Sequence, residues 1–353
     1  MGDDEDGSRE PEPLPVPFVR PTAVWGPRVS AASLRYMEEV HRVRATDVIV
    51  ATYPKCGTTL LQWLCHCLRS GCETEVEDLY TVSPWLAHAF DMQQDLAVVG
   101  CQYSPRVYKS HQALSGELRG CRYVVALREP RDVAVSKYNF FRAKNLPAAM
   151  CGGARAPRLN ELGRVNSFMN GGRGGQPLGL WPTYCEYWLA RDCSSVLVLV
   201  YEDLVRDLAG HARLLADHMG VAASDELIAR VARECSKQGM LKHEAKLDDS
   251  WASRRMRAIQ GERYDPSWNP AAKVVADNDP VKTDEVLDQQ SLAWLDAKWA
   301  AIVTPATGFA SYADMSAAFR QRNEAKLAEI DARRARQQQE PQRQRKPRAA
   351  SLL

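Results

Sequence analysis

A lysine, a glycine and two threonines stand together in the order Lys55-Cys56-Gly57-Thr58-Thr59. The lysine offers a positive charge, the threonines offer hydroxyl groups, and the glycine lets an anion approach the backbone because it has no Cβ. At the start of a helix such residues lie beside backbone N–H groups that have no partner within the helix. The pattern predicts a phosphate-binding loop. The alternative is a lysine beside two N-capping threonines.

Two further pairs of residues could act on the same ligand. Lys109 and His111 lie two positions apart, and a histidine is the side chain whose unperturbed pKa suits proton transfer near neutral pH. Arg128 and Ser136 lie eight positions apart, and arginine binds phosphate through two parallel hydrogen bonds. Taken alone, Arg128 could instead form a surface ion pair and Ser136 could be a neutral helix residue.

The elements around these residues are typical of an α/β protein. Apolar runs predict buried strands at Val48–Thr52, Arg122–Arg128 and Val196–Val200, and a shorter strand over 105–111. Helical spacing follows at 60–68, 131–142, 181–190, 204–219 and 225–233. Ligands of open parallel sheets bind outside the carboxyl ends of the strands. We therefore predict a parallel sheet with helices on both faces and the candidate residues at one edge.

Several segments resemble the cytosolic sulfotransferases. Tyr-Pro-Lys-Cys-Gly-Thr-Thr over 53–59 is similar to that family's Tyr-Pro-Lys-Ser-Gly-Thr-Thr loop, which holds the 5′-phosphosulfate of PAPS (3′-phosphoadenosine 5′-phosphosulfate). The segment 127–141 resembles Arg-Asn-Pro-Lys-Asp-Val-Ala-Val-Ser-Tyr-Tyr, whose arginine and serine hold the 3′-phosphate. Lys-Ser-His over 109–111, Tyr-Glu-Asp over 201–203 and the turn 234–240 also have counterparts, in the family's order.

The resemblance covers roughly residues 45 to 315 and implies a sulfotransferase fold, related to P-loop proteins, that transfers a sulfonate group from PAPS to a hydroxyl or amine of a small-molecule acceptor. His111 would be the base, with Lys55 and Lys109 stabilising charge, and no metal would be needed. The remaining implied nucleotide contacts are Cys56, Gly57, Thr58, Thr59, Leu60, Arg128, Ser136, Tyr201, Cys235, Ser236, Met240 and Lys273.

Three positions depart from the family pattern. Cys56 replaces the loop serine, and Leu60 replaces a tryptophan that stacks on adenine, a contact worth roughly 1–3 kcal/mol. Trp63 is not expected to substitute, because three residues of helix turn it to another direction. The family's Arg-Lys-Gly-x-x-Gly segment corresponds to 273–283, which contains Lys273 but no glycine. A noncatalytic nucleotide-binding relative therefore stays an alternative, as does a small-molecule kinase that uses Asp132 to bind magnesium.

Composition bounds the remaining functions. The 353 residues include 46 basic and 44 acidic side chains, so the net charge of +2 does not indicate a nucleic-acid or membrane partner. The ten cysteines show no paired zinc-site spacing, and the acidic N-terminus has no signal-peptide pattern. We expect a cytoplasmic protein with a disordered acidic, proline-rich arm (1–22), one sulfotransferase domain (23–320) and a basic tail (321–353). A homodimer remains an open alternative.

Overall fold

The computed structural model describes residues 31–37, 41–112, 114, 120–143, 179–259 and 287–344. Four parallel strands form one sheet in the order β2–β1–β3–β4, with bounds β1 Val48–Ala51, β2 Val107–Ser110, β3 Arg122–Leu127 and β4 Val196–Val200. Each pair is in simple register, with Val48 beside both Val107 and Arg122. The predicted strands are confirmed.

Helices connect the strands and continue the chain after β4. Before β3 these are α1 (Ala31–Arg35), α2 (Thr58–Ser70), α3 (Leu79–Val82) and the 3₁₀ turn η3 (Leu86–His88). After β3 come α4 (Pro130–Ala143), α6 (Leu180–Leu189), α7 (Tyr201–Arg206), α8 (Leu208–Met219), α9 (Asp225–Glu234), α10 (Lys237–Lys242), α11 (Glu244–Leu247) and α12 (Ser250–Ile259). The last are α14 (Gln289–Lys298), the π-helical turn η6 (Trp299–Val303), α15 (Thr304–Thr307) and α16 (Tyr312–Gln344).

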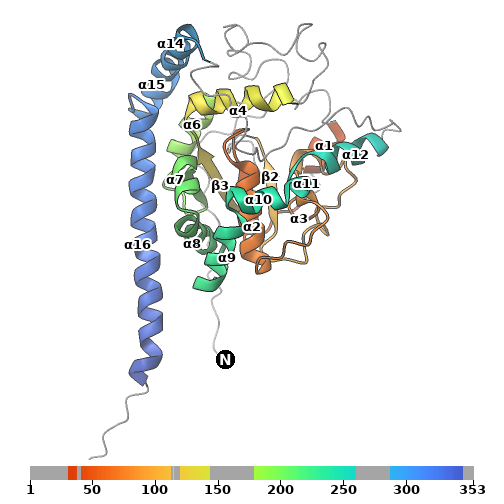
Figure 1. Ribbon diagram of the computed structural model, residues 1–353, viewed down its shortest axis with the longest axis vertical. Coiled ribbons are helices and arrows are strands. Elements are labelled where there is room, and N and C mark those ends of the chain that lie inside the picture. Colours follow the sequence, from red (N-terminus) through yellow and green to blue (C-terminus); the bar gives the residue numbers. More distant parts are fainter. Residues whose placement is uncertain are drawn as a thin grey trace, which may run out of the picture.

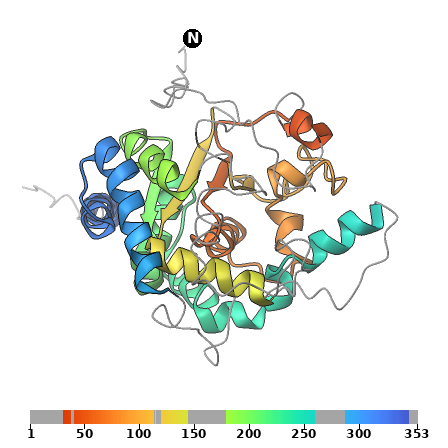
Figure 2. The same cartoon turned by 90° about the horizontal axis from the view of Figure 1, so that it is seen from above.

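Both faces of the sheet are covered, because successive strand residues point to opposite sides. Ile49, Val125 and Val198 pack with α4, α6, η6 and the start of α16 in one core. Val50, Val124 and Leu197 pack with α2, α8 and α9 in a second core on the other face. Seen from above, the sheet stands between α2 (orange) and the C-terminal helices (blue) (Figure 2). The predicted layer arrangement is confirmed.

One predicted helix, 204–219, is divided in the structure. Its first turn belongs to α7, and α8 starts afresh at Leu208 because Asp207 caps it. The Asp207 carboxylate accepts a hydrogen bond of 2.8 Å from the Gly210 backbone N–H. An aspartate inside an apolar pattern can thus begin a new helix, because its side chain competes for the backbone donors.

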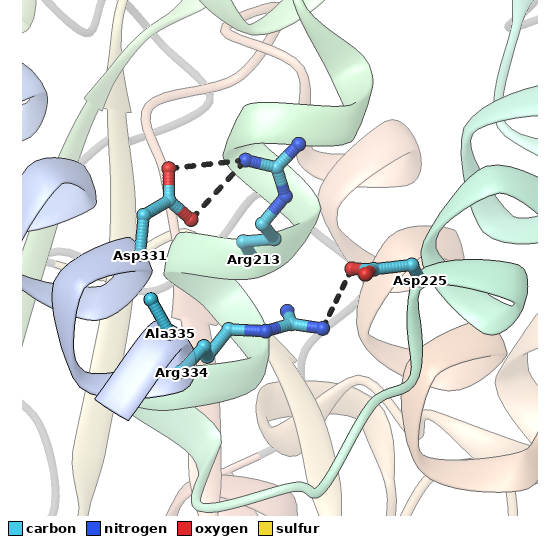
Figure 3. A pocket seen from close by; sticks show the side chains of 5 residues that line it. All are labelled: Arg213, Asp225, Asp331, Arg334 and Ala335. Atoms are coloured by element: carbon cyan, nitrogen blue, oxygen red, sulfur yellow. Dashed lines mark hydrogen bonds and ion pairs between the residues drawn. The ribbon is translucent and has the colours of Figure 1, made fainter. Parts of the chain in front are cut away.

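The long helix α16 lies along one side of the body, and its C-terminal part extends beyond it (Figure 1). Position 320, where we expected the domain to end, lies inside this helix. Beyond that point Asn323 Nδ2 still donates to the Val198 carbonyl at 3.0 Å. Figure 3 shows Arg213 pairing with Asp331 and Arg334 pairing with Asp225 across a surface cavity of about 300 Å³. Helix α16 therefore packs on the body well past residue 320.

The part of the chain that the structure describes contains no helix both long and apolar enough to span a bilayer. The nine cysteines within it are all free thiols.

Candidate active site

The loop between β1 and α2 has the backbone geometry expected of the predicted anion cradle. Gly57 has φ 89° and ψ 17°, a left-handed conformation that favours glycine, and it is the N-cap of α2 without a side-chain cap. A Cβ at Gly57 would lie 2.8 Å from Cδ2 of Tyr201, so a side chain there would also collide with that ring. Thr58 and Thr59 are the first two residues inside the helix. The N-capping interpretation of these threonines is therefore wrong, and the predicted strand, loop and helix are confirmed.

Arg128 lies against this loop at the carboxyl end of β3. Its Nη1 donates to the Lys55 carbonyl at 2.8 Å, and its guanidinium lies 4.4 Å from the centre of the Tyr201 ring. Within the described residues its buried Nε has no hydrogen-bond partner. A buried N–H without an acceptor is costly, so this donor fits an anion that would accept from it.

The side chain of Lys55 connects the loop to α4. Its Nζ lies 4.2 Å from the centre of the Phe140 ring. Ser136 is half-buried and lies one turn before Phe140, so both residues share the face of α4 that Lys55 contacts. The structure thus brings Lys55, Arg128, Ser136 and Tyr201 to the same edge of the sheet, although their contact with a nucleotide stays a prediction.

His111 follows β2 and also contacts the loop. Its Nδ1 lies 2.8 Å from the carbonyl oxygen of Thr52, and the Thr52 and Thr58 hydroxyl oxygens lie 2.5 Å apart. A carbonyl oxygen can only accept, so Nδ1 carries the proton and the neutral ring has its lone pair on Nε2. The Trp85 ring meets the imidazole edge-on, with 5.4 Å between ring centres. This tautomer is the one a general base needs at Nε2.

Lys109 packs against an aromatic wall, formed by Tyr80, Trp85 and Trp251, that the sequence did not predict. Its side chain is buried, with Nζ 3.6 Å from the centre of the Trp85 ring. The same Nζ donates to the Tyr80 hydroxyl at 2.6 Å, and that hydroxyl donates to Asp249 Oδ1 at 2.7 Å. Burial, followed by the nearby Asp249 carboxylate, raises the pKa of Tyr80 well above its ordinary value. Lys109 is therefore linked through Tyr80 to a segment far along the chain.

Buried side chains pack within the loop or form hydrogen bonds to it. The thiol of Cys56 has no exposed surface, and burial raises its pKa to about 12, so it is a neutral packing group. Tyr187 on α6 bonds the loop twice: its hydroxyl donates to the Ala51 carbonyl at 3.0 Å and accepts from the Tyr53 N–H at 3.2 Å. Lys137 of α4 donates to the Tyr53 hydroxyl at 2.5 Å. Sequence reasoning missed Tyr187 and Lys137, whose only signal was an aromatic helix and one lysine on a helix.

Four other predicted nucleotide contacts lie around α2 and α10. Leu60, Cys235 and Met240 are largely buried in the core shared with α2. Ser236 caps α10: its Oγ accepts from the Gly239 N–H at 3.1 Å and donates to the Arg233 carbonyl at 2.7 Å. Their roles toward a nucleotide stay predictions. Lys273 lies outside the described residues.

Trp63 is a core residue, as its direction on the helix predicts. It is fully buried, and its ring centre lies 5.5 Å from that of His66 and 5.4 Å from that of His243. It cannot replace the tryptophan that the resemblance places at Leu60.

A second surface cavity, of about 530 Å³, is lined by Glu77, Gln93, Trp251, Arg254, Arg255, Ala258 and Ile259. Neither this cavity nor the one beside α16 is lined by the loop, so the candidate site rests on the loop geometry rather than on cavity size. Over the described ranges, no group of three or more histidine, cysteine or acidic side chains is arranged to hold a metal ion.

Comparisons with known proteins agree with this geometry. A family model described as "Sulfotransferase domain" matches residues 45–271. Human Sulfotransferase 4A1 is 31% identical over 207 residues, which span 56% of this chain and 69% of that protein. The fold is similar to a retinol dehydratase solved with retinol and PAP (TM-score 0.53, 19% identity, covering 77% of this chain and 86% of the other). It is also similar to mouse sulfotransferase SULT7A1 solved with PAP (TM-score 0.52, 15% identity, 78% and 90% covered). The chain therefore belongs to the sulfotransferase family.

Proposed function

We propose that this member of the family transfers the sulfonate group of PAPS to a hydroxyl group of a small apolar acceptor, with His111 as the general base. The observation that carries the proposal is the hydrogen bond from His111 Nδ1 to the Thr52 carbonyl. It supports the proposal because, with the proton on Nδ1, the basic nitrogen of the neutral imidazole is Nε2, beside the loop that we propose binds the anion. When bound, PAPS supplies the sulfonate group and its bisphosphate leaving group.

His111 takes the acceptor's proton on Nε2 while the acceptor oxygen bonds to the sulfonate sulfur. The bond between that sulfur and the 5′-phosphate oxygen breaks, and adenosine 3′,5′-bisphosphate leaves with the electron pair. The resulting imidazolium is stabilised because its Nδ1–H already donates to a carbonyl oxygen, and a hydrogen bond from a charged donor is stronger than one from a neutral donor. The edge of Trp85 restricts the ring, so the imidazole need not reorient during proton transfer.

Positive groups at the loop stabilise the negative charge of the leaving group. Lys55 lies in the loop, and the N-terminus of α2 adds partial positive charge. Groups that are fixed before the reaction stabilise developing charge without reorganising. Arg128 and Ser136 would bind the 3′-phosphate, and Tyr201 would lie under the adenosine.

The aromatic wall suits an apolar acceptor such as a phenol or a steroid alcohol. Tyr80 and Met92 are buried together, and Trp85, Trp251 and Met256 pack against them. The retinol and androsterone present in related structures are small apolar alcohols of the same class. We propose that the protein works in the cytoplasm on such molecules, without a metal ion, and does not bind nucleic acid or a membrane.

The test of the base is sulfonate transfer from labelled PAPS to phenols, aliphatic alcohols and amines. His111→Ala should lower turnover by about 10² to 10⁴, the usual contribution of a positioned acid or base. It should leave the affinity for adenosine 3′,5′-bisphosphate nearly unchanged, because His111 faces the acceptor. His88→Ala is the matched control, since His88 also meets Trp85 edge-on, at 4.2 Å.

Several outcomes would contradict the proposal. If His111→Ala transfers sulfonate as well as wild type, another group is the base. If wild type binds the bisphosphate but transfers to no acceptor, the protein is a noncatalytic relative. Phosphorylation of an acceptor by ATP and Mg²⁺ would instead establish a kinase.

A second measurement tests the 3′-phosphate contacts. Arg128→Ala should weaken bisphosphate binding more than Ser136→Ala does, because a charge-assisted contact is stronger than a neutral hydroxyl bond. Calorimetric titration gives both affinities. Equal losses would show that Arg128 does not bind the phosphate.

A further inference from the structure

Lys137 is a buried cation that the proposed mechanism does not use. It lies on α4 directly after Ser136 and has a relative exposure of only 7%. Its Nζ is 2.5 Å from the Tyr53 hydroxyl and 4.4 Å from the centre of that ring. Tyr53 is the residue from which the phosphate loop starts. Lysine is seldom buried without a functional or electrostatic reason, because removing its charge from water is costly.

The charged groups that influence Lys137 lie in the loop, and Lys137 in turn influences Cys56 of the loop. Burial lowers the pKa of Lys137 to about 7; the nearby Cys56 opposes this effect, and repulsion from Lys55 adds to it. Arg128 and Lys137 are also the two cations that oppose the effect of burial on the Cys56 thiol. Three positive side chains, Lys55, Arg128 and Lys137, therefore converge on the loop around Cys56. An anion in the cradle would relieve their mutual repulsion.

We propose that Lys137 belongs to the anion site: from beneath the loop it supplies positive charge that strengthens binding of the nucleotide phosphates without touching them. The inference rests on the proposed function in taking the nucleotide as the natural ligand. In the family segment that 127–141 resembles, this position is a tyrosine, so the added cation is a feature of this chain. It acts through a buried region of low dielectric, where Coulomb interactions are stronger than in water.

The proposal predicts a coupling between binding and protonation. A charged Lys137 favours the bound anion, and by reciprocity the anion raises the pKa of Lys137. Binding should therefore take up protons above pH 7 and should weaken as pH rises. Among the described residues, the ionisable groups that face this region are Tyr53, Lys55 and Cys56 of the loop, Arg128 after β3, Tyr184 and Tyr187 of α6, Glu202 of α7 and Tyr312 of α16. A comparison of variants at Lys137 alone separates its contribution from theirs.

The experiment is calorimetric titration with adenosine 3′,5′-bisphosphate and, separately, with inorganic pyrophosphate, at pH 6.5 and 8.5. Two buffers of different ionisation enthalpy give the proton uptake. Lys137→Met keeps the length of the side chain but not its charge, and should weaken both ligands at pH 6.5 by about tenfold, the equivalent of one pKa unit of coupling. It should also lose the uptake of protons at pH 8.5. Lys326→Met on α16 removes a lysine outside the loop region and should change neither quantity.

Lys137→Arg provides a second variant if the methionine protein does not fold. Arginine stays charged at both pH values, so binding should no longer weaken between pH 6.5 and 8.5. The proposal is overturned if Lys137→Met binds both ligands like wild type with the same proton uptake, or if Lys137→Arg keeps the full pH dependence. Suppose that wild type binds pyrophosphate but not the bisphosphate, and that Lys137→Met loses the binding of pyrophosphate. The role of Lys137 in an anion site would then stand, and the proposed function would be refuted. Wild type that binds neither ligand would refute both.

Discussion

The hydroxyl of Tyr80 joins Lys109 to Asp249, and removing it tests whether this chain of contacts positions the lysine. The hydroxyl accepts from Lys109 Nζ at 2.6 Å and donates to Asp249 Oδ1 at 2.7 Å. Tyr80→Phe deletes one oxygen atom and keeps the ring, which is buried with Met92 and Ala252. Among the described residues, the substitution therefore removes these two hydrogen bonds and keeps the ring packing.

The magnitude follows from the burial of the partners. Each bond involves a charged group, and such bonds contribute about 1.5–3 kcal/mol. The Lys109 side chain is only 4% exposed, so it cannot recover a water molecule easily. The Trp85 ring remains 3.6 Å from Nζ, and a desolvated cation–π contact of about 2 kcal/mol retains part of the stabilisation. We expect the free energy of unfolding to fall by about 2–4 kcal/mol.

Urea unfolding of four proteins measures the effect: wild type, Tyr80→Phe, Asp249→Asn and the double variant. The double-mutant cycle should give a coupling of about 1–3 kcal/mol between Tyr80 and Asp249. Turnover should fall by about tenfold to a hundredfold in Tyr80→Phe, because a small displacement of a charge-stabilising group is enough. Affinity for the bisphosphate should change little.

Tyr108→Phe is the control. Tyr108 precedes Lys109 on β2, and its neutral hydroxyl donates a hydrogen bond of 3.2 Å to the Leu96 carbonyl, which the substitution removes. It should cost about 1 kcal/mol and leave turnover unchanged. If Tyr80→Phe is as stable and as active as wild type, or if the cycle shows no coupling, the chain from Asp249 to Lys109 has no role.

Three further substitutions test the fold and the loop. Asp47→Asn should lower the free energy of unfolding by about 3–5 kcal/mol in urea, because the buried Arg106 loses its carboxylate partner; a change below 1 kcal/mol would contradict this. Gly57→Ala should weaken bisphosphate binding in calorimetry, because φ is 89° and the new Cβ meets the Tyr201 ring; unchanged affinity would show that the loop can move aside. Burial raises the pKa of Glu129 to about 7, so the folded state holds its proton more tightly and stability falls as pH rises from 4.5 to 7. The free energy of unfolding of Glu129→Gln minus that of wild type should therefore be about 1–2 kcal/mol larger at pH 8 than at pH 5, after allowance for the partial exposure of Glu129. A difference that does not depend on pH would refute the pKa shift.

The sequence alone determined the parallel sheet and most of the residues at its edge. Apart from Arg122 at the start of β3, the strands Val48–Ala51, Arg122–Leu127 and Val196–Val200 are apolar, and only a strand covered on both faces needs that pattern. Because each motif follows its strand directly, strand position fixed the placement of Lys55 and Arg128. The Tyr-Pro-Lys-Cys-Gly-Thr-Thr segment is also local, so its resemblance predicted the loop correctly.

The tertiary structure decided which side chains surround those residues. Tyr80 and Asp249 are 169 positions apart, and Tyr53 and Lys137 are 84 apart, so no periodicity relates them. The packing of elements that are distant in the sequence decides such contacts. One face of α4 packs on the loop, and the segment before α12 packs on the aromatic wall. Hydrophobic spacing can predict that a helix covers a sheet, but it contains no information on which polar group meets which across the interface. Lys137 lies on the face of α4 that meets the loop, and only the packing of that helix brings its Nζ to the Tyr53 hydroxyl.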